Sequence, residues 1–242
     1  GRGRACGEAL AREGVDVIVN GRTDSDVHTT AEWIASKYAV SATPVIGDCS
    51  TPEGHAALLT ACTEPDIVLL NGEGPPPVPF LNISEDAWEE STRRTMISPL
   101  LFVQRIISGM QERRFGRIIA ISSAMVKSPN PLMSTSQGPR LGLAAVLKGL
   151  SKTTAQHNVT INTLLPERFD TGRQEQMAKL VMEHRGISYE EARAEQIASS
   201  KAGRLGLPEE FGDACAFLCS AQAGYISGQS LQLDGGSHEG IF

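Results

Sequence analysis

Short apolar runs alternate with stretches of helical periodicity along almost the whole chain. Runs of strand length occur at Val15–Asn20, Thr43–Ile46, Ile67–Leu70, Arg117–Ile121, Val159–Leu164 and Ser230–Leu233. Between them the pattern predicts helices at Arg4–Glu13, Asp24–Lys37, Pro52–Cys62, Ser84–Arg114, Thr135–His157 and Pro208–Ser220. Strands that alternate with helices form a parallel sheet with helices on both faces. The sequence therefore predicts an α/β fold with a doubly wound, Rossmann-type sheet.

The segment from about 172 to 200 departs from this alternation. It contains two charged helical patches, with Gly186 between them, and no strand. An insertion at this point lies over the carboxyl ends of the strands, where ligands of such sheets bind. We expect residues 1–242 to form one domain in which this insertion acts as a substrate lid.

The first predicted helix has no strand before it. Gly1-Arg2-Gly3 reads as the end of a glycine-rich turn that enters a helix. In this architecture the preceding strand is central, so a sheet without it has two unpaired edges in its interior. We expect the natural chain to continue upstream of Gly1 with that strand.

Charge and composition narrow the range of partners. The net charge is −6, whereas a nucleic-acid site needs basic residues gathered on one face. No apolar run approaches the ~18 residues that span a membrane, and the five cysteines are scattered without the spacing of a zinc site. We expect a cytoplasmic protein with reduced thiols and no metal site, bound neither to nucleic acid nor to membranes.

Several short motifs follow one another in a recognisable order. After Gly1 and Gly3, Asp48 follows the second predicted strand, and Asn71 with Gly72 follows the third. Pro166 and Thr171 follow the fifth, and residues 225–236 read YISGQSLQLDGG. Together these motifs resemble the classical short-chain dehydrogenase/reductase family, nearest to β-ketoacyl-acyl-carrier-protein reductases and their atypical relatives, over essentially the whole chain.

The resemblance implies a dinucleotide site. The amides of Gly1 and Gly3 would face the pyrophosphate, Asp48 the adenine, and Thr171, after Pro166, the nicotinamide amide. Asn71 and Gly72 occupy the place of the family's Asn-Asn-Ala-Gly motif. Taken singly, a Gly-x-Gly is more often a plain turn, and an aspartate at a strand end often caps the next helix.

One residue bears on the choice of cofactor. A carboxylate at the end of the second strand of the family would bind the ribose 2′-hydroxyl of NAD, but this chain has Asn20-Gly21-Arg22. Arg22 suits the 2′-phosphate of NADP through paired hydrogen bonds. We therefore expect NADP as the cofactor, with NAD as the alternative. If Arg22 has no role in binding, it is an ordinary surface arginine in contact with solvent.

The family's catalytic residues are mostly replaced. Ser123 matches the serine that steadies the oxyanion, but the positions of the tyrosine and the lysine hold Ser136 and Arg140, and that of the asparagine holds Thr95. A serine hydroxyl is a much weaker acid than a phenol, and an arginine stays protonated. Arg140 would then stabilise the oxyanion electrostatically while water supplies the proton.

Two glutamates stand where the family has glycines that let the backbone approach the cofactor. Glu73 follows Asn71-Gly72, and Glu167 follows Pro166. A carboxylate about 6 Å from a phosphate charge would cost roughly 3 kcal/mol at an effective dielectric of ~20. In the other reading these side chains turn outward or bind ribose hydroxyls, and cost little.

Two functions follow from these residues. The first is an NADP-dependent oxidoreductase that resembles 3-oxoacyl-acyl-carrier-protein reductase and acts on a small carbonyl or acyl substrate. The second is a non-catalytic relative that binds a ligand or a partner subunit.

The resemblance also implies a homo-oligomer, a dimer or a tetramer, formed through the fourth and fifth helices. An apolar stripe on the fourth helix, at Met96, Leu100, Val103, Ile107 and Met110, suits that contact or packing on the sheet.

Overall fold

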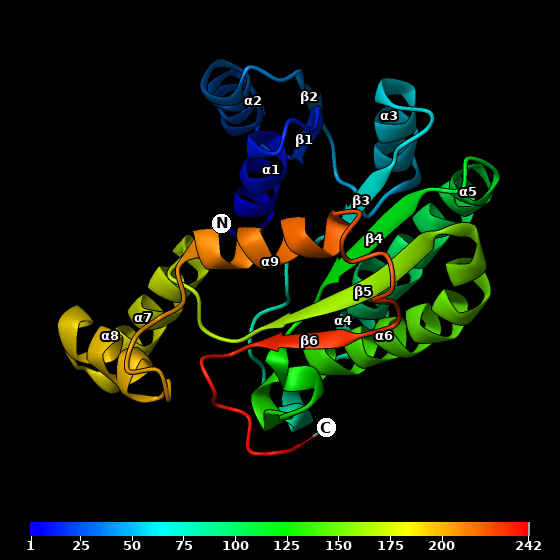
Figure 1. Ribbon diagram of the computed structural model, residues 1–242. Helices are drawn as coiled ribbons and strands as arrows, with labels where there is room; N and C mark the ends of the chain where they lie inside the picture. Colours follow the sequence, from blue (N-terminus) through cyan, green and yellow to red (C-terminus); the bar gives the residue numbers. More distant parts are fainter. Residues whose placement is uncertain (242) are drawn as a thin grey trace.

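The computed structural model describes residues 1–241, and the strands in that range are all parallel (Figure 1). The strands are β1 (Val17–Gly21), β2 (Ala42–Ile46), β3 (Ile67–Leu70), β4 (Gly116–Ile121), β5 (Val159–Pro166) and β6 (Ser230–Leu233). The helices are α1 (Arg2–Arg12), α2 (Asp24–Tyr38), α3 (Pro52–Ala61), α4 (Glu85–Thr92), α5 (Ser98–Glu112), α6 (Ser134–Thr154), α7 (Gly172–Arg185), α8 (Tyr189–Ala198) and α9 (Pro208–Cys219). The predicted α/β fold is confirmed, and each predicted strand lies within two residues of its observed bounds.

The sheet consists of two pieces. β1 pairs with β2, while β3, β4, β5 and β6 pair in that order. Within residues 1–241 no strand joins β1 to β3, and a cavity of about 870 Å³ lies between them, lined by apolar side chains that include Val17, Val19 and Leu69. In Figure 1, β1 and β2 stand apart from the larger sheet. The two unpaired edges expected from the sequence are thus present.

Two apolar cores lie on the two faces of the larger sheet. Alternate residues of β4 point to opposite faces. Ile119 and Ile121 pack beneath α1 and α9, with Phe211 fully buried among them. Ile118 and Ala120 face α5 and α6. All six residues of β4 are buried, as expected for a parallel strand covered on both sides.

The helix predicted over Ser84–Arg114 is present as a continuous helical run, although it is not a regular α-helix throughout. It is divided into α4, a π-helical turn at Arg93–Ile97, and α5. Pro99 explains the interruption, because a proline within a helix has no N–H and clashes with the carbonyl four residues earlier. That carbonyl belongs to Thr95, so the widened turn lies at one of the predicted site residues.

The segment from 172 to 200 forms the two predicted helices. α7 and α8 pack against each other through Ala178 and Ala192, which are both buried. Gly186 ends α7 with a φ of 66°, a conformation that favours glycine. Ser188 then opens α8 with a capping box. The pair projects from the carboxyl edge of the sheet beside the N-terminus of α1 (Figure 1).

No helix in residues 1–241 combines the length and apolarity that crossing a membrane requires.

Candidate active site

A cavity of about 470 Å³ lies at the carboxyl ends of β1 to β4. This is the edge where parallel α/β sheets bind their ligands. Six of the predicted site residues line it: Arg22, Asp48, Asn71, Gly72, Thr95 and Arg140. Residues from five separate chain segments therefore meet in one space.

The N-terminus of α1 approaches the wall of this cavity at Gly3, which lies against the side chain of Asn71. A Cβ atom at Gly3 would lie 2.7 Å from Nδ2 of Asn71, so any larger residue there would force the Asn71 side chain to move. Gly1 is the N-cap of α1 and has no such close neighbour. The free amides of this first turn offer hydrogen bonds to an anion.

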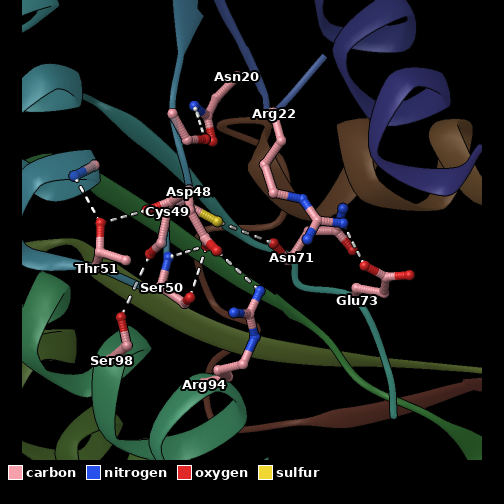
Figure 2. Close-up of polar contacts among 12 residues, drawn as sticks. Asn20, Arg22, Asp48, Cys49, Ser50, Thr51, Asn71, Glu73, Arg94 and Ser98 are labelled. Atoms are coloured by element: carbon pink, nitrogen blue, oxygen red, sulfur yellow. Dashed lines mark hydrogen bonds and ion pairs between the residues drawn. The ribbon is translucent and has the colours of Figure 1, made fainter. Parts of the chain in front are cut away.

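Asp48 is held by neighbours on two sides. Its Oδ1 accepts hydrogen bonds from the Ser50 amide at 2.9 Å and the Ser50 hydroxyl at 2.6 Å, and its Oδ2 pairs with Arg94 at 3.0 Å (Figure 2). These bonds with Ser50, together with the charge of Arg94, lower the pKa of Asp48. The N-cap of α3 is Thr51 rather than Asp48. Asp48 therefore shapes the wall of the cavity as a carboxylate.

Glu73 faces Arg22 across the mouth of the cavity. Nη2 of Arg22 and Oε2 of Glu73 are 2.5 Å apart, and both side chains are more than half exposed (Figure 2). The carboxylate that the sequence places near the phosphates is thus paired with the arginine expected to bind the 2′-phosphate. Glu73 thus competes with any other anion for Nη2 of Arg22.

Thr95 lines the cavity from the π-helical turn. Because Pro99 has no N–H, the carbonyl of Thr95 lacks the donor that a regular α-helix would supply. Interruptions of this kind are frequent at functional sites. The main-chain oxygen of Thr95 therefore lies where the regular hydrogen-bond pattern of the helix changes, on the wall of the cavity.

Arg140 and Ser136 form a buried pair on α6. The guanidinium of Arg140 donates from Nη1 to the hydroxyl of Ser136 and to its carbonyl, and the two residues are 8% and 5% exposed. Burial, followed by the charges of Arg2 and Arg173, lowers the pKa of Arg140 to about 10. Arg140 remains a cation at neutral pH and lines the cavity. Ser136 fixes the position of its guanidinium through the two hydrogen bonds from Nη1.

The end of β4 brings two serines to the site. Ser122 lines the cavity, and its hydroxyl is buried without a hydrogen-bond partner among the described residues. Ser123 follows directly, is half-buried, and accepts a hydrogen bond from the amide of Met125 at 3.3 Å. The space beside Arg140 and Thr95 is therefore faced by Ser122, with Ser123 next to it.

Pro166 and Thr171 lie beyond the end of β5. Pro166 is the last residue of that strand, and Thr171 is the N-cap of α7. The Thr171 hydroxyl is buried, with 8% of the residue exposed, and has no hydrogen-bond partner within residues 1–241. Glu167 is partly exposed, and its Oε1 lies 3.8 Å from Nε of the neighbouring Arg168.

The sequence did not single out four further residues of the site. Ser122 and Arg94 line the cavity. Arg2 and Arg173 act on Arg140 through their charges. Arg2 stands between the two predicted glycines and Arg173 two residues after Thr171, so their positions beside predicted residues were the available signal.

These features fit a dinucleotide cofactor. Gly3 leaves room where a Cβ atom would close the turn, the first turn of α1 has free amides, and the buried Ser122 and Thr171 hydroxyls lack partners. An unpaired buried hydroxyl costs free energy, which a bound polar ligand recovers. The polar groups therefore suit the pyrophosphate and the amide of such a cofactor.

The chain belongs to the short-chain dehydrogenase/reductase family. A family model described as enoyl-(acyl carrier protein) reductase matches residues 1–238. The order of strands, the glycine turn and the site at the carboxyl edge agree with that assignment. The resemblance inferred from the motifs is confirmed.

Individual relatives and solved structures align over the whole chain. The NADPH-dependent reductase BacG of Bacillus subtilis is 32% identical, covering 100% of this chain and 95% of that protein. The 3-oxoacyl-[acyl-carrier-protein] reductase FabG of Aquifex aeolicus is 31% identical, covering 98% and 92%. The crystal structure of YwfH, an NADPH-dependent reductase involved in bacilysin biosynthesis, superposes with a TM-score of 0.93 at 28% identity, covering 100% of this chain and 95% of that one.

Proposed function

We propose that this protein reduces the carbonyl group of a small molecule to an alcohol with NADPH, in the manner of a 3-oxoacyl-acyl-carrier-protein reductase. The chain is an oxidoreductase of the short-chain dehydrogenase/reductase type. The observation that carries the proposal is the cavity lined by Arg140, Thr95 and Ser122, whose wall also includes Asn71, the residue against which Gly3 of α1 lies. The relatives named as NADPH-dependent reductases favour a reductase over a non-catalytic scaffold.

NADPH, when bound, supplies a hydride to the carbonyl carbon. The amides of Gly1 and Gly3 bind its pyrophosphate, and Thr171 binds the carboxamide of its nicotinamide. Arg22 binds the 2′-phosphate after release from Glu73, which favours NADP over NAD. Asp48, Asn71, Gly72 and Pro166 form the surrounding wall.

Arg140 stabilises the negative charge that develops on the carbonyl oxygen. Its guanidinium is buried, so its charge acts in a medium of low dielectric where a donor to an oxyanion is most effective. Ser136 is a positioning residue, since it holds Nη1 of Arg140 by two hydrogen bonds. Ser123, at the end of β4, provides a second donor to the oxyanion.

The proton reaches the oxygen from water. The carbonyl of Thr95 lacks its helical donor and accepts a hydrogen bond from a water molecule beside the substrate. A guanidinium with a pKa of about 10 holds its proton at neutral pH, so water rather than Arg140 is the proton source. The residues that replace the family's tyrosine and lysine then stabilise charge instead of transferring a proton.

α7 and α8 serve as the substrate lid within a single domain. Arg173 at the start of α7 donates to the Pro75 carbonyl at 3.3 Å, which links this helix pair to the loop after β3. The five cysteines are free thiols, three of them buried, which suits the reducing cytoplasm.

Oxidation of NADPH in the presence of a 3-oxoacyl thioester, followed at 340 nm, tests the reaction. Arg140→Ala is expected to lower kcat by about 100-fold or more, the usual effect of removing a donor to an oxyanion. Arg113→Ala removes a half-buried arginine that is paired with Glu64 and does not line the cavity, and it serves as the control with unchanged kcat. Absence of NADPH binding at millimolar concentration, or an unchanged rate in Arg140→Ala, would contradict the proposal.

A further inference from the structure

Arg140 lines the active-site cavity, and two further arginines, Arg2 and Arg173, lie close enough for their charges to act on it. Arg2 lies in the first turn of α1, Arg140 on α6, and Arg173 in the first turn of α7. Nη2 of Arg140 is 3.3 Å from the place that a Cβ atom would take on Gly74, and Nη2 of Arg173 donates to the carbonyl of Pro75 at 3.3 Å. Two guanidinium groups therefore meet on the same part of the loop after β3, and the charge of Arg2 also acts on Arg140.

Within residues 1–241 no carboxylate pairs with these cations. Over residues 1–241 none of the three forms an ion pair, whereas surface arginines such as Arg12 and Arg204 do. Arg140 is 8% exposed, and its hydrogen bonds in the described chain go only to Ser136. Burial lowers the pKa values of Arg2 and Arg140, and the charge of Arg173 lowers both further. Crowded, partly desolvated like charges are unfavourable, and a bound anion would relieve them.

We propose that this arginine cluster, Arg2, Arg140 and Arg173, binds a free carboxylate on the carbonyl substrate, so that the preferred substrate is a 2-oxo or 3-oxo acid rather than a neutral ketone or thioester. The planar guanidinium fork matches a carboxylate through paired hydrogen bonds. Arg140 then faces the carbonyl oxygen, while Arg173 and Arg2 bind the adjacent carboxylate. The inference rests on the proposed function, because it assigns the substrate of that same site.

A neutral substrate would leave the cluster uncompensated. Its carbonyl can use one donor of Arg140, but the charges of Arg2 and Arg173 then stay without a counter-ion. A site built to bind a polar group rejects an analogue without that group strongly, since its own buried donors remain unpaired. Selectivity for the acid over its ester is therefore the direct consequence.

Calorimetry with 2-oxobutanoate and its methyl ester tests this inference. The two ligands differ in one charge, and both are titrated into protein saturated with NADP⁺. The acid is expected to bind at least about tenfold more tightly than the ester. Arg173→Gln should weaken the acid about tenfold and leave the ester unchanged, with partial recovery in Arg173→Lys. Arg185→Gln removes an exposed arginine at the other end of α7, paired with Glu195, and is the matched control.

The outcomes separate this inference from the reaction on which it rests. Equal binding of acid and ester, no binding of either, or no effect of Arg173→Gln would overturn it. So would competition between the acid and NADP⁺, because the cluster would then be a receptor for cofactor phosphate. Reduction of a neutral 3-oxoacyl thioester as efficiently as of the acid would overturn the inference but leave the proposed reductase standing, whereas failure of NADPH to bind would remove both.

Discussion

Replacing Glu73 by glutamine tests how the ion pair at the cavity mouth controls cofactor binding. Arg22 and Glu73 are 60% and 63% exposed, so their attraction contributes no more than about 1 kcal/mol. The substitution also removes a repulsion between the carboxylate and the cofactor phosphates. At about 6 Å this repulsion is ~0.7 kcal/mol in water and ~3 kcal/mol at an effective dielectric of 20, and the exposure of Glu73 favours ~1 kcal/mol.

The two contributions act differently on the two cofactors. Both NADPH and NADH gain from the lost repulsion, but only NADPH has the 2′-phosphate that uses the released Arg22. Glu73→Gln is therefore expected to tighten NADPH binding by 1 to 2 kcal/mol, roughly five- to thirtyfold, and NADH binding by about fivefold or less. Both gains should shrink in 0.5 M salt, because exposed charges are screened.

Titration of cofactor fluorescence measures these constants directly. Asp213→Asn is the matched control: it makes the same change of charge and breaks an exposed ion pair, Arg12–Asp213 at 2.8 Å, away from the residues that line the cavity. If Glu73→Gln leaves the affinity for NADPH unchanged, or if Asp213→Asn produces the same gain, Glu73 does not oppose the cofactor and the reasoning fails. A gain that is equal for NADH and NADPH would refute the role of Arg22 alone.

Three further predictions concern stability and assembly. Gly212→Ala is expected to lower the free energy of unfolding by about 2 kcal/mol in a urea titration, because its Cβ would lie 2.4 Å from a main-chain oxygen of α1, whereas Gly7→Ala, with open space, should not. Burial lowers the pKa of His55, so folding favours its neutral form. The wild type should therefore lose stability as pH falls below about 6.5, where the unfolded chain binds a proton that the folded chain does not. His55→Gln should flatten the dependence of Tm on pH in that range. Leu101 on α5 is 46% exposed, and Leu101→Lys is expected to shift a homo-oligomer towards monomer by light scattering, while Leu180→Lys on the lid should not.

The periodicity of the chain predicted the fold because each strand is a compact apolar run. β3 and β6 have the predicted bounds, and β4 is buried along its whole length. The π-helical turn in the fourth predicted helix was not predicted, although the residue that causes it, Pro99, is visible in the sequence. Apolar periodicity continues through Pro99, so the pattern alone favours one helix; the proline rule would have placed the break near Thr95.

The sequence predicted which residues line the cavity better than it predicted which of their side chains pair with one another. Counting along the motifs placed Thr95 and Arg140 at one cavity, since elements of a known fold keep their order. The pairing of Arg22 with Glu73 joins positions 51 residues apart and depends on side-chain direction, which sequence patterns do not encode. For the same reason the sequence left open whether Glu73 repels the phosphates or turns away from them.

The replacements at positions 136 and 140 depend on each other. On a helix, residues four apart share a face, so the side chain at 136 determines what surrounds the one at 140. Arg140 is buried and needs acceptors, and Ser136 supplies both its hydroxyl and its main-chain carbonyl one turn earlier. A tyrosine at 136 would extend a ring towards the space that the guanidinium fills, and a lysine at 140 would leave the fork of hydrogen bonds incomplete. Because each exchange accommodates the other, the pair forms a coherent cationic site, which loss of either residue alone would break.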